Sequence, residues 1–290
     1  MRNLNPILGL LLLARLTPAM AQVKVEVALD QEQFLPGEAL VASVKIRNRS
    51  GQVLHMGGDA DWLTFSVEAR EGFVVTKISE VPVKGEFTLE SAQVATKKVD
   101  LSPYFVLTRL GHYSVTATVR IKEWNGQETS PPKGFDIING AKLWSQDFGV
   151  PTTKTASGQA PEIRRYALVQ ANYLKQLRLY FRLTDDSESK VFRLYSIGPL
   201  VGMSQPEHQV DQFSHLHVLY QNGARTFSYT VFNPDGETVV RQTYAYIGSR
   251  PRLQPDKDGT VSVIGGERRM MSNDLPVTKK SEDEPKPPKP

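Results

Sequence analysis

Strict alternation of apolar and polar residues is the feature that most constrains this chain. From Val23 to Leu29 every second residue is a bulky aliphatic one, and polar or small residues fill the places between. Residues 41–48, 62–69 and 113–121 repeat the pattern, and turn-forming segments separate them. Helical three-four spacing is nowhere sustained among these segments. Period-two patterning is typical of half-buried strands, so the first half of the chain is predicted to be an antiparallel β-sandwich.

Two positions near the longest of these segments have predicted structural roles. Tyr113 stands just before the alternating run, where a sandwich places a tyrosine corner whose hydroxyl bonds to upstream backbone. Asn125 and Gly126 form the strongest short hairpin signal, because both residue types tolerate a positive φ. We expect them to join the Tyr113 strand to a last strand near residues 134–138.

The second half of the chain also predicts strands. Turn signals rich in Asp, Asn and Gly punctuate a series of Tyr-, Val- and Arg-rich segments over residues 163–268. Two of these segments resemble each other as strand, acidic turn, strand and Ile-Gly, but the region is too short for a closed propeller. We therefore expect a second antiparallel domain, either a small sandwich or blade-like meanders, giving an all-β protein overall.

The remaining segments complete the predicted domain organisation. Residues 1–21 combine an early arginine, a short apolar run and a small-x-small cleavage site, which indicates a signal peptide cut after Ala21 and not a buried core helix. The first domain is expected to span 22–139, and a linker 140–162. Residues 269–290 are rich in Pro, Lys and Glu and are expected to be a disordered tail.

Composition narrows the class of protein. The chain has no cysteine, which excludes disulfides, a thiolate metal site, a cysteine nucleophile and a lipid-modified cysteine. Removal of residues 1–21 lowers the formal net charge from +4 to +2, because two arginines and no acid are lost. So small an excess gives no argument for nucleic-acid binding. We expect an exported bacterial protein, periplasmic or extracellular, with no transmembrane segment after cleavage.

The order of motifs in the first half carries a family resemblance. "PGEALVASVKIRNRSGQ", "DADWLTFSV" and "LGHYSVTATV" follow one another at sandwich spacing. This order resembles bacterial immunoglobulin-like domains, including the BsuPI-type proteinase inhibitor domain and macroglobulin-like modules. The resemblance covers about 115 residues and implies an immunoglobulin-like sandwich that acts as a binding module, with protease inhibition as one form of that role. No inhibitory loop is matched residue by residue.

The pair His215 and His217 is the strongest metal candidate. On a strand the two side chains project to the same face, and His208 lies only a loop away. In the alternative interpretation, which we favour, Leu216 and Val218 pack inward while both histidines face solvent. A metal site needs ligands that converge with correct geometry, and two neighbouring histidines alone do not provide that.

A second group of side chains suggests a ligand-binding face. Aromatic and arginine residues recur along the second-domain strands, where stacking and hydrogen bonding could hold a sugar or a peptide. Ordinary sheet packing explains the same tyrosines, which favour strands. The residues of this candidate face are Tyr180, Arg182, Arg193, Tyr195, Tyr229, Tyr244 and Tyr246.

Other motif matches are rejected on structural context. "SESK" at 187–190 has the spelling of penicillin-recognising enzymes, but those need a helix and these residues fall in a predicted turn. Asp256, Asp258 and Glu267 have EF-hand spacing, but the sixth loop position is Val261 where the motif needs glycine. Asp59 and Asp61 provide too few carboxylates for a calcium site and suggest a solvated loop.

These observations predict a non-catalytic protein. We expect an exported binding or envelope-assembly protein whose partner is another envelope or secreted protein, or a surface polymer, with no cofactor. One alternative is a secreted protease inhibitor of the BsuPI type. An alternative from another class is a secreted metal-dependent hydrolase that uses the second domain.

Overall fold

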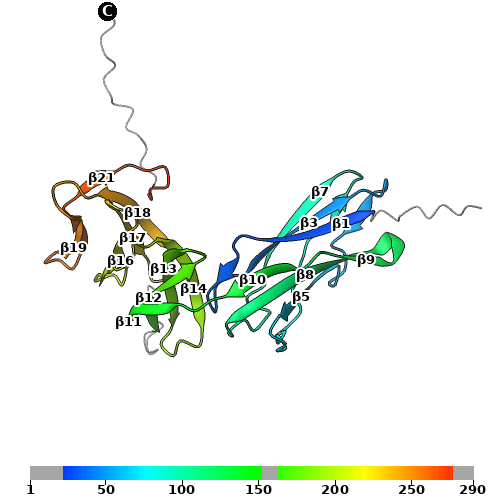
Figure 1. The fold of residues 1–290 in the computed structure, drawn as a ribbon, viewed down its shortest axis with the longest axis horizontal. Coiled ribbons are helices and arrows are strands. Elements are labelled where there is room, and N and C mark those ends of the chain that lie inside the picture. The colour runs from blue at the N-terminus through cyan, green and yellow to red at the C-terminus, as the bar shows by residue number, and fades with distance from the viewer. Residues whose placement is uncertain (1–21, 152–161, 277–290) are drawn as a thin grey trace, which may run out of the picture.

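The computed structural model describes residues 22–151 and 162–276, and the predicted signal peptide lies outside these ranges. The described chain is almost entirely β-structure, with a single short 3-10 helix, η1 (Lys122–Trp124). Figure 1 shows the strands gathered into two domains that lie side by side. The predicted all-β architecture with two successive antiparallel domains is confirmed.

The first domain is a sandwich of two main sheets. One sheet has the order β1 (Val23–Leu29), β3 (Val41–Asn48), β7 (Val94–Asp100). The other has the order β2 (Gln33–Phe34), β10 (Lys133–Ile137), β8 (Gly111–Ile121), β5 (Leu63–Ala69), with β9 (Gly126–Thr129) also paired to β8. A short pair, β4 (Leu54–Met56) and β6 (Phe87–Leu89), closes one end.

The alternation in the sequence creates the core of this sandwich. Along β8 every second side chain from Tyr113 to Ile121 is buried, and the residues between are more exposed. The aliphatic face of β3 meets this row from the opposite sheet in one continuous apolar cluster. The expected inward positions of β1 follow the same rule: Val23 and Val25 are buried, and Val27 and Leu29 are partly so.

Tyr113 forms the predicted tyrosine corner. Its ring stacks on Phe135, with ring centroids 5.4 Å apart, and its hydroxyl donates to the backbone oxygen of Arg109 at 2.6 Å. Burial raises the pKa of this phenol. Tyr113 is therefore structural.

The turn at Asn125 differs from the predicted two-residue hairpin. Asn125 has a φ of 47° and closes η1, whereas Gly126 is already the first residue of β9. The turn is longer because residues 122–124 form a 3-10 turn before the chain reverses. The return strand is divided into β9 and β10, both paired with β8, with two prolines between them that lack the N–H a continuous ladder needs.

The second domain packs two meanders face to face. The first meander has the order β11 (Ala141–Gly149), β12 (Ile163–Tyr173), β13 (Gln176–Asp185), β14 (Val191–Pro199). The second has the order β15 (Glu207–Val210), β16 (Leu216–Gln221), β17 (Thr226–Phe232), β18 (Thr238–Ala245), β21 (Glu267–Arg269). A separate hairpin joins β19 (Arg252–Pro255) and β20 (Val261–Ile264).

Two predicted boundaries of the second domain are wrong. The expected linker 140–162 contains β11, which pairs with β12 and carries Phe148 onto the ring of Tyr166 at a centroid distance of 4.0 Å. Part of the expected tail also belongs to the fold, because Leu275 forms a β-bridge to Arg241. Residues 277–290 lie outside the described residues.

The two domains contact each other directly. Leu35 of the first domain packs in an apolar cluster with Val169, Tyr180 and Leu194 of the second. The Leu174 amide donates to the Gln33 side-chain oxygen at 2.6 Å. The junction is therefore a packed interface.

No helix in the described ranges is long and apolar enough to cross a membrane.

Candidate functional site

The side chains on the inner face of the second meander change from wholly apolar to partly polar along its length. At one end Leu216 and Phe232 pair across β16 and β17 and belong to the apolar core between the sheets. Farther along the same face, Val218 pairs with Thr230 and Tyr220 pairs with Ser228. Since side chains directly opposite on neighbouring strands share a face, this inner surface gains two buried hydroxyl side chains beside the core residues Val218 and Tyr220.

A polar groove lies over this surface. The groove encloses about 490 Å³ between the meanders, within the range of ligand pockets. Residues 195–199 of β14 form one wall, and Ser228, Thr230 and Arg241 come from the facing sheet. Gln176 and Arg178, at the start of β13, and Asn222 and Asn273 complete the lining together with Tyr220 and Thr238.

The groove is positively charged. Its lining contains no aspartate or glutamate. Arg178 lies over the ring of Tyr173, 3.9 Å from the guanidinium carbon to the ring centroid. Within the described ranges neither Arg178 nor Arg241 forms an ion pair. Arg241 therefore lines the groove without an ion pair, whereas the Arg178 guanidinium lies on the opposite face of its sheet, together with Ala171 and Tyr173.

The groove also contains an unsatisfied acceptor. The side-chain oxygen Oδ1 of Asn222 is buried and has no hydrogen-bond partner among the described residues. A buried acceptor without a partner is destabilising, so such a group is a candidate for a bound water or a ligand.

The β14 wall is held in place by two tyrosines. Tyr195 donates its hydroxyl to the Gly236 backbone oxygen at 3.0 Å, and Tyr220 donates to the Ile197 backbone oxygen. Burial raises the pKa of both phenols, so both are neutral donors at ordinary pH. Gly198 has a φ of 146°, and a Cβ there would lie 2.6 Å from the Tyr220 hydroxyl oxygen.

The predicted histidine pair forms a different cluster. Asp211, in the turn between β15 and β16, accepts the amides of Phe213 and His215 on Oδ1 at 2.9 and 2.8 Å. Its Oδ2 lies 3.2 Å from Nδ1 of His215 and 3.2 Å from Nε2 of His217. The other nitrogen of His217 lies 2.7 Å from the Tyr229 hydroxyl. Both histidines therefore converge on one carboxylate.

The chemistry of these groups sets the proton positions. A carboxylate only accepts, so Nε2 of His217 donates to Asp211 and Nδ1 accepts from Tyr229 in the neutral imidazole. Burial lowers the pKa of His217, although Asp211 opposes this effect. Burial alone would raise the pKa of Asp211, but hydrogen bonds from the His215 amide and from both imidazoles hold it below its usual value.

The predicted three-histidine metal site does not form. His208 pairs with Val218 in the β15–β16 ladder and stacks on Trp144 at a centroid distance of 4.1 Å, on the core side of the sheet, while Gln209 is the residue opposite His217. No group of three or more His, Cys, Asp or Glu side chains in residues 22–151 and 162–276 could hold a metal ion. The favoured alternative is confirmed for Leu216 and Val218, which pack inward, and corrected for His217, which does not face solvent because it is only 7% exposed.

The predicted ligand face is divided among several surfaces. Tyr180 and Arg182 point to the domain junction, where Tyr180 packs with Leu35 and Arg182 lines a cavity beside it. Tyr229 and Tyr244 pack together on the side of the second meander away from the groove. Tyr195 alone of the seven lines the groove, and Arg193 and Tyr246 are exposed.

The groove residues were missed because each is ordinary on its own. Arg178, Asn222 and Arg241 carry no motif. The sequence of β17 did contain a sign of this surface. Ser228 and Thr230 lie on the same face of the strand as Phe232, which packs in the core, so polar residues occupy positions where apolar ones are expected.

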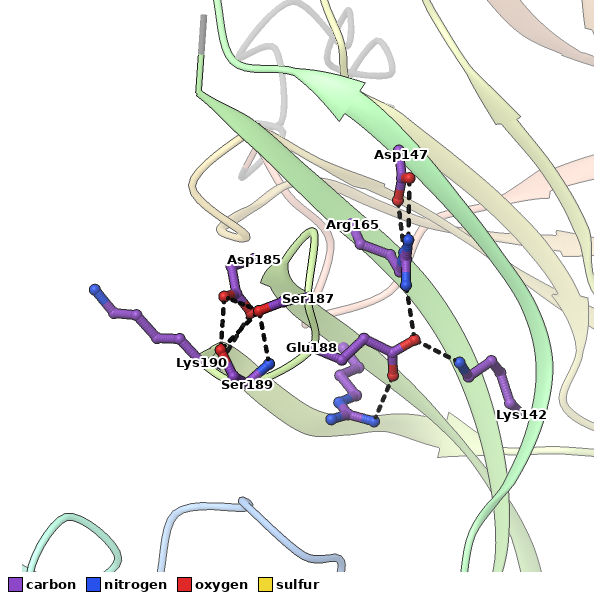
Figure 2. A network of polar contacts seen from close by, with 9 residues as sticks. Lys142, Asp147, Arg165, Asp185, Ser187, Glu188, Ser189 and Lys190 are labelled. Carbon is purple, nitrogen blue, oxygen red and sulfur yellow. Dashed lines mark hydrogen bonds and ion pairs between the residues drawn. The ribbon is translucent and has the colours of Figure 1, made fainter.

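The rejected motifs form local polar contacts. Figure 2 shows Ser187 and Ser189 both donating to the Asp185 carboxylate in the β13–β14 turn, so "SESK" is a turn and not a helix. Beside it, Glu188 joins Lys142 at 2.7 Å and Arg165 at 3.0 Å. These two cations hold the pKa of Glu188 below its usual value.

The remaining acidic candidates also have local partners. Asp59 pairs with Lys122 at 2.9 Å and Asp61 with Arg120 at 2.8 Å. Asp258 accepts the Thr260 amide and hydroxyl in the turn that leads into β20, as the turn interpretation predicts.

Comparisons with known proteins give a distant structural likeness. No family model matches the chain, and a search of curated proteins returned no match. Among solved structures, the chain is similar to Spo0M, a sporulation control protein from Bacillus subtilis, with 10% sequence identity and a TM-score of 0.31. That alignment covers 61% of this chain and 90% of Spo0M.

Proposed function

We propose that this chain is an exported, non-catalytic binding protein that holds a polar ligand in the groove of its second domain. The observation that carries the proposal is the composition of the groove: Arg241 without an ion pair among the described residues, the hydroxyl of Thr238 and the ring of Tyr195 beside it, and no acidic residue in the lining. Arranged polar groups that lack protein partners are what a binding site offers to its ligand.

The histidine cluster does not favour the hydrolase alternative. Asp211, His217 and Tyr229 follow the order carboxylate, imidazole, hydroxyl that nucleophilic catalysis uses. Tyr229, however, is 7% exposed, packs among Leu219, Phe227 and Val231, and has a pKa raised by burial. A hydroxyl that is buried and hard to ionise is a poor nucleophile, so the cluster is better suited to holding the β15–β16 turn.

The first domain has a supporting role in this proposal. Its sandwich is packed against the second domain through Leu35, and the resemblance of its motifs to bacterial immunoglobulin-like modules supports contact with another envelope or secreted protein. Export rests on the signal pattern of residues 1–21.

The test is site-specific photocrosslinking in intact cells of the source organism. A photoreactive residue replaces Ser196 in the groove wall, and a matched control replaces Gln127, which is exposed on β9 of the first domain. We expect a reproducible adduct, protein or polymer, from position 196 that is absent at 127. Equal adducts from both positions, or none at 196, would overturn the groove as the binding site.

A further inference from the structure

We propose that the cavity at the domain junction binds a short-chain monocarboxylate, a small acid with one negative charge and an apolar body. The cavity encloses about 230 Å³ and shares no lining residue with the groove of the second domain. Most ligand pockets enclose roughly 300 to 1,000 Å³, so this one suits a molecule of only a few heavy atoms. The inference is independent of the function proposed for the groove.

Both domains contribute walls to this cavity. The turn after β2 brings Leu35 and Pro36, and the connection between β10 and β11 brings Asn139 and Gly140. A ligand here would therefore touch both domains and the segment that joins them. The second domain completes the lining with Lys142, Val169, Arg182 and Leu194.

The strand register places two cations on the face that borders the cavity. Val169 and Leu194 pack in one apolar cluster with Leu35, which identifies the junction face of the first meander. Lys142 of β11 is directly opposite Val169, and Arg182 of β13 is directly opposite Leu194. Side chains directly opposite on neighbouring strands share a face, so both cations belong to the junction face.

Arg182 has the less complete set of partners of these two cations. The described structure gives its guanidinium no hydrogen bond, and its Nη1 lies 3.5 Å from Oε2 of Glu188. The side chain is 24% exposed, but Nε is enclosed by protein, so a ligand can meet only the two terminal nitrogens. The planar fork of a guanidinium suits a carboxylate, which makes the acid group of the ligand its natural partner.

Neighbouring carboxylates do not neutralise this site. The lining contains no aspartate or glutamate. Beside it, Glu188 is shared with Lys142 at 2.7 Å and Arg165 at 3.0 Å, as Figure 2 shows, and Asp147 pairs with Arg165. With Arg182, three cations share two carboxylates in this ion-pair cluster, so one further negative charge would balance it.

The apolar walls select the rest of the ligand. Leu35 and Pro36 on one side and Val169 and Leu194 on the other give aliphatic surface to whatever fills the cavity. A short alkyl chain gains free energy by leaving water for such walls. A strongly hydrated dianion such as phosphate would lose its water without a matching second positive charge.

The test is isothermal titration calorimetry of the purified protein at constant ionic strength. The main probes are butyrate and butyramide, which have the same shape but differ in charge, and acetate, phosphate and N-acetylvaline are the comparison probes. Arg182→Gln and Lys142→Gln are compared with Arg252→Gln, a matched loss of charge on β19 at the end of the second domain away from the junction (Figure 1). Thermal melting verifies that each variant is folded.

We expect butyrate to bind about tenfold or more tightly than butyramide, the scale of one charge-assisted hydrogen bond. Arg182→Gln should weaken butyrate binding by a similar factor. Lys142→Gln should weaken it less, because the Lys142 ammonium already donates to Glu188. Arg252→Gln should bind butyrate like the parent. If Arg182→Gln fails to fold, the ratio of butyrate to butyramide affinity in the parent still decides the role of the charge.

Several results would overturn the proposal. Equal affinity for butyrate and butyramide, or a folded Arg182→Gln with unchanged affinity, would exclude a carboxylate at Arg182. Acetate or phosphate binding as tightly as butyrate would replace the amphipathic acid by a simple anion. Tighter binding of N-acetylvaline would replace the free acid by the C-terminus of a peptide. Absence of binding by all five probes would exclude the cavity as a site for small acids.

Discussion

Nε2 of His217 lies 3.2 Å from Oδ2 of Asp211, and this carboxylate also accepts the backbone of the turn that begins β16. The Asp211 carboxylate thus holds both the His217 side chain of β16 and the turn that precedes this strand. His217 is neutral in this arrangement because it donates through one nitrogen and accepts through the other.

Stability should therefore fall as the pH falls below about 6.5, the ordinary histidine pKa. Burial lowers the pKa of folded His217, so the unfolded chain binds more protons in this range and stability rises with pH. The loss begins near the unfolded pKa and continues until the pH passes the lowered folded value. His208, whose pKa burial also lowers, contributes with the same sign.

The test is the thermal midpoint between pH 8 and pH 5 in the parent, His217→Gln and His208→Gln. Each substitution should reduce the dependence of the thermal midpoint on pH in part, and the double variant should reduce it further. His55→Gln, at a side chain 72% exposed, is the control. An unchanged slope in the double variant would contradict this assignment.

Loss of the Asp211 carboxylate should be costly. Asp211→Ala leaves two backbone amides and two imidazole donors without their acceptor, and we expect a loss of about 3 kcal/mol in the free energy of unfolding. Asp61→Ala removes an exposed ion pair with Arg120 and should change stability by less than about 1 kcal/mol. Urea unfolding measures both, and similar values for the two would argue against a structural role for Asp211.

Removal of the Tyr113 hydroxyl should weaken the first domain. Tyr113→Phe keeps the ring stacked on Phe135 but loses the bond to the Arg109 carbonyl, for which we expect about 1 kcal/mol. Tyr104→Phe is the matched control, because the described structure gives the Tyr104 hydroxyl no hydrogen bond. Denaturant unfolding followed by tryptophan fluorescence reports the change, since Trp62 lies in that core.

The groove wall should not tolerate a side chain at position 198. Gly198→Ala combines an unfavourable φ of 146° with a Cβ placed 2.6 Å from the Tyr220 hydroxyl oxygen. We expect a loss of about 1 to 3 kcal/mol, the usual range for a strained backbone position. Gly149→Ala, where φ is not positive and nothing lies within 4 Å of the added Cβ, is the control. The double variant Gly198→Ala/Tyr220→Phe lacks the hydroxyl that the added Cβ would meet. The loss of stability caused by that clash should therefore disappear, and the loss caused by the unfavourable φ should remain.

The sequence predicted what depends on local periodicity. Alternation identified the β8 face that ends at Ile121, and the position of Tyr113 before that run identified its corner bond. Such features can be predicted from the sequence because they depend on residues that are close together along the chain.

The sequence could not predict what depends on contacts between distant strands. Tyr195 and Arg241 line one groove only because β14 and β18 belong to facing sheets. His208 separates from His217 because the β15–β16 register, which no motif records, places it opposite Val218. The linker boundary was wrong because the turn-rich residues after 149 outweighed the apolar positions of β11.

The polar positions of Ser228 and Thr230 have a kinetic consequence. Two sheets that face each other with aliphatic side chains close together to expel water, whereas the hydroxyls of Ser228 and Thr230, which are 8% and 3% exposed, weaken that drive where the groove begins beside them. The groove is thus already open in the protein without ligand. Association should then be a single bimolecular step, with an observed rate that rises linearly with ligand concentration and shows no plateau from a slow opening motion.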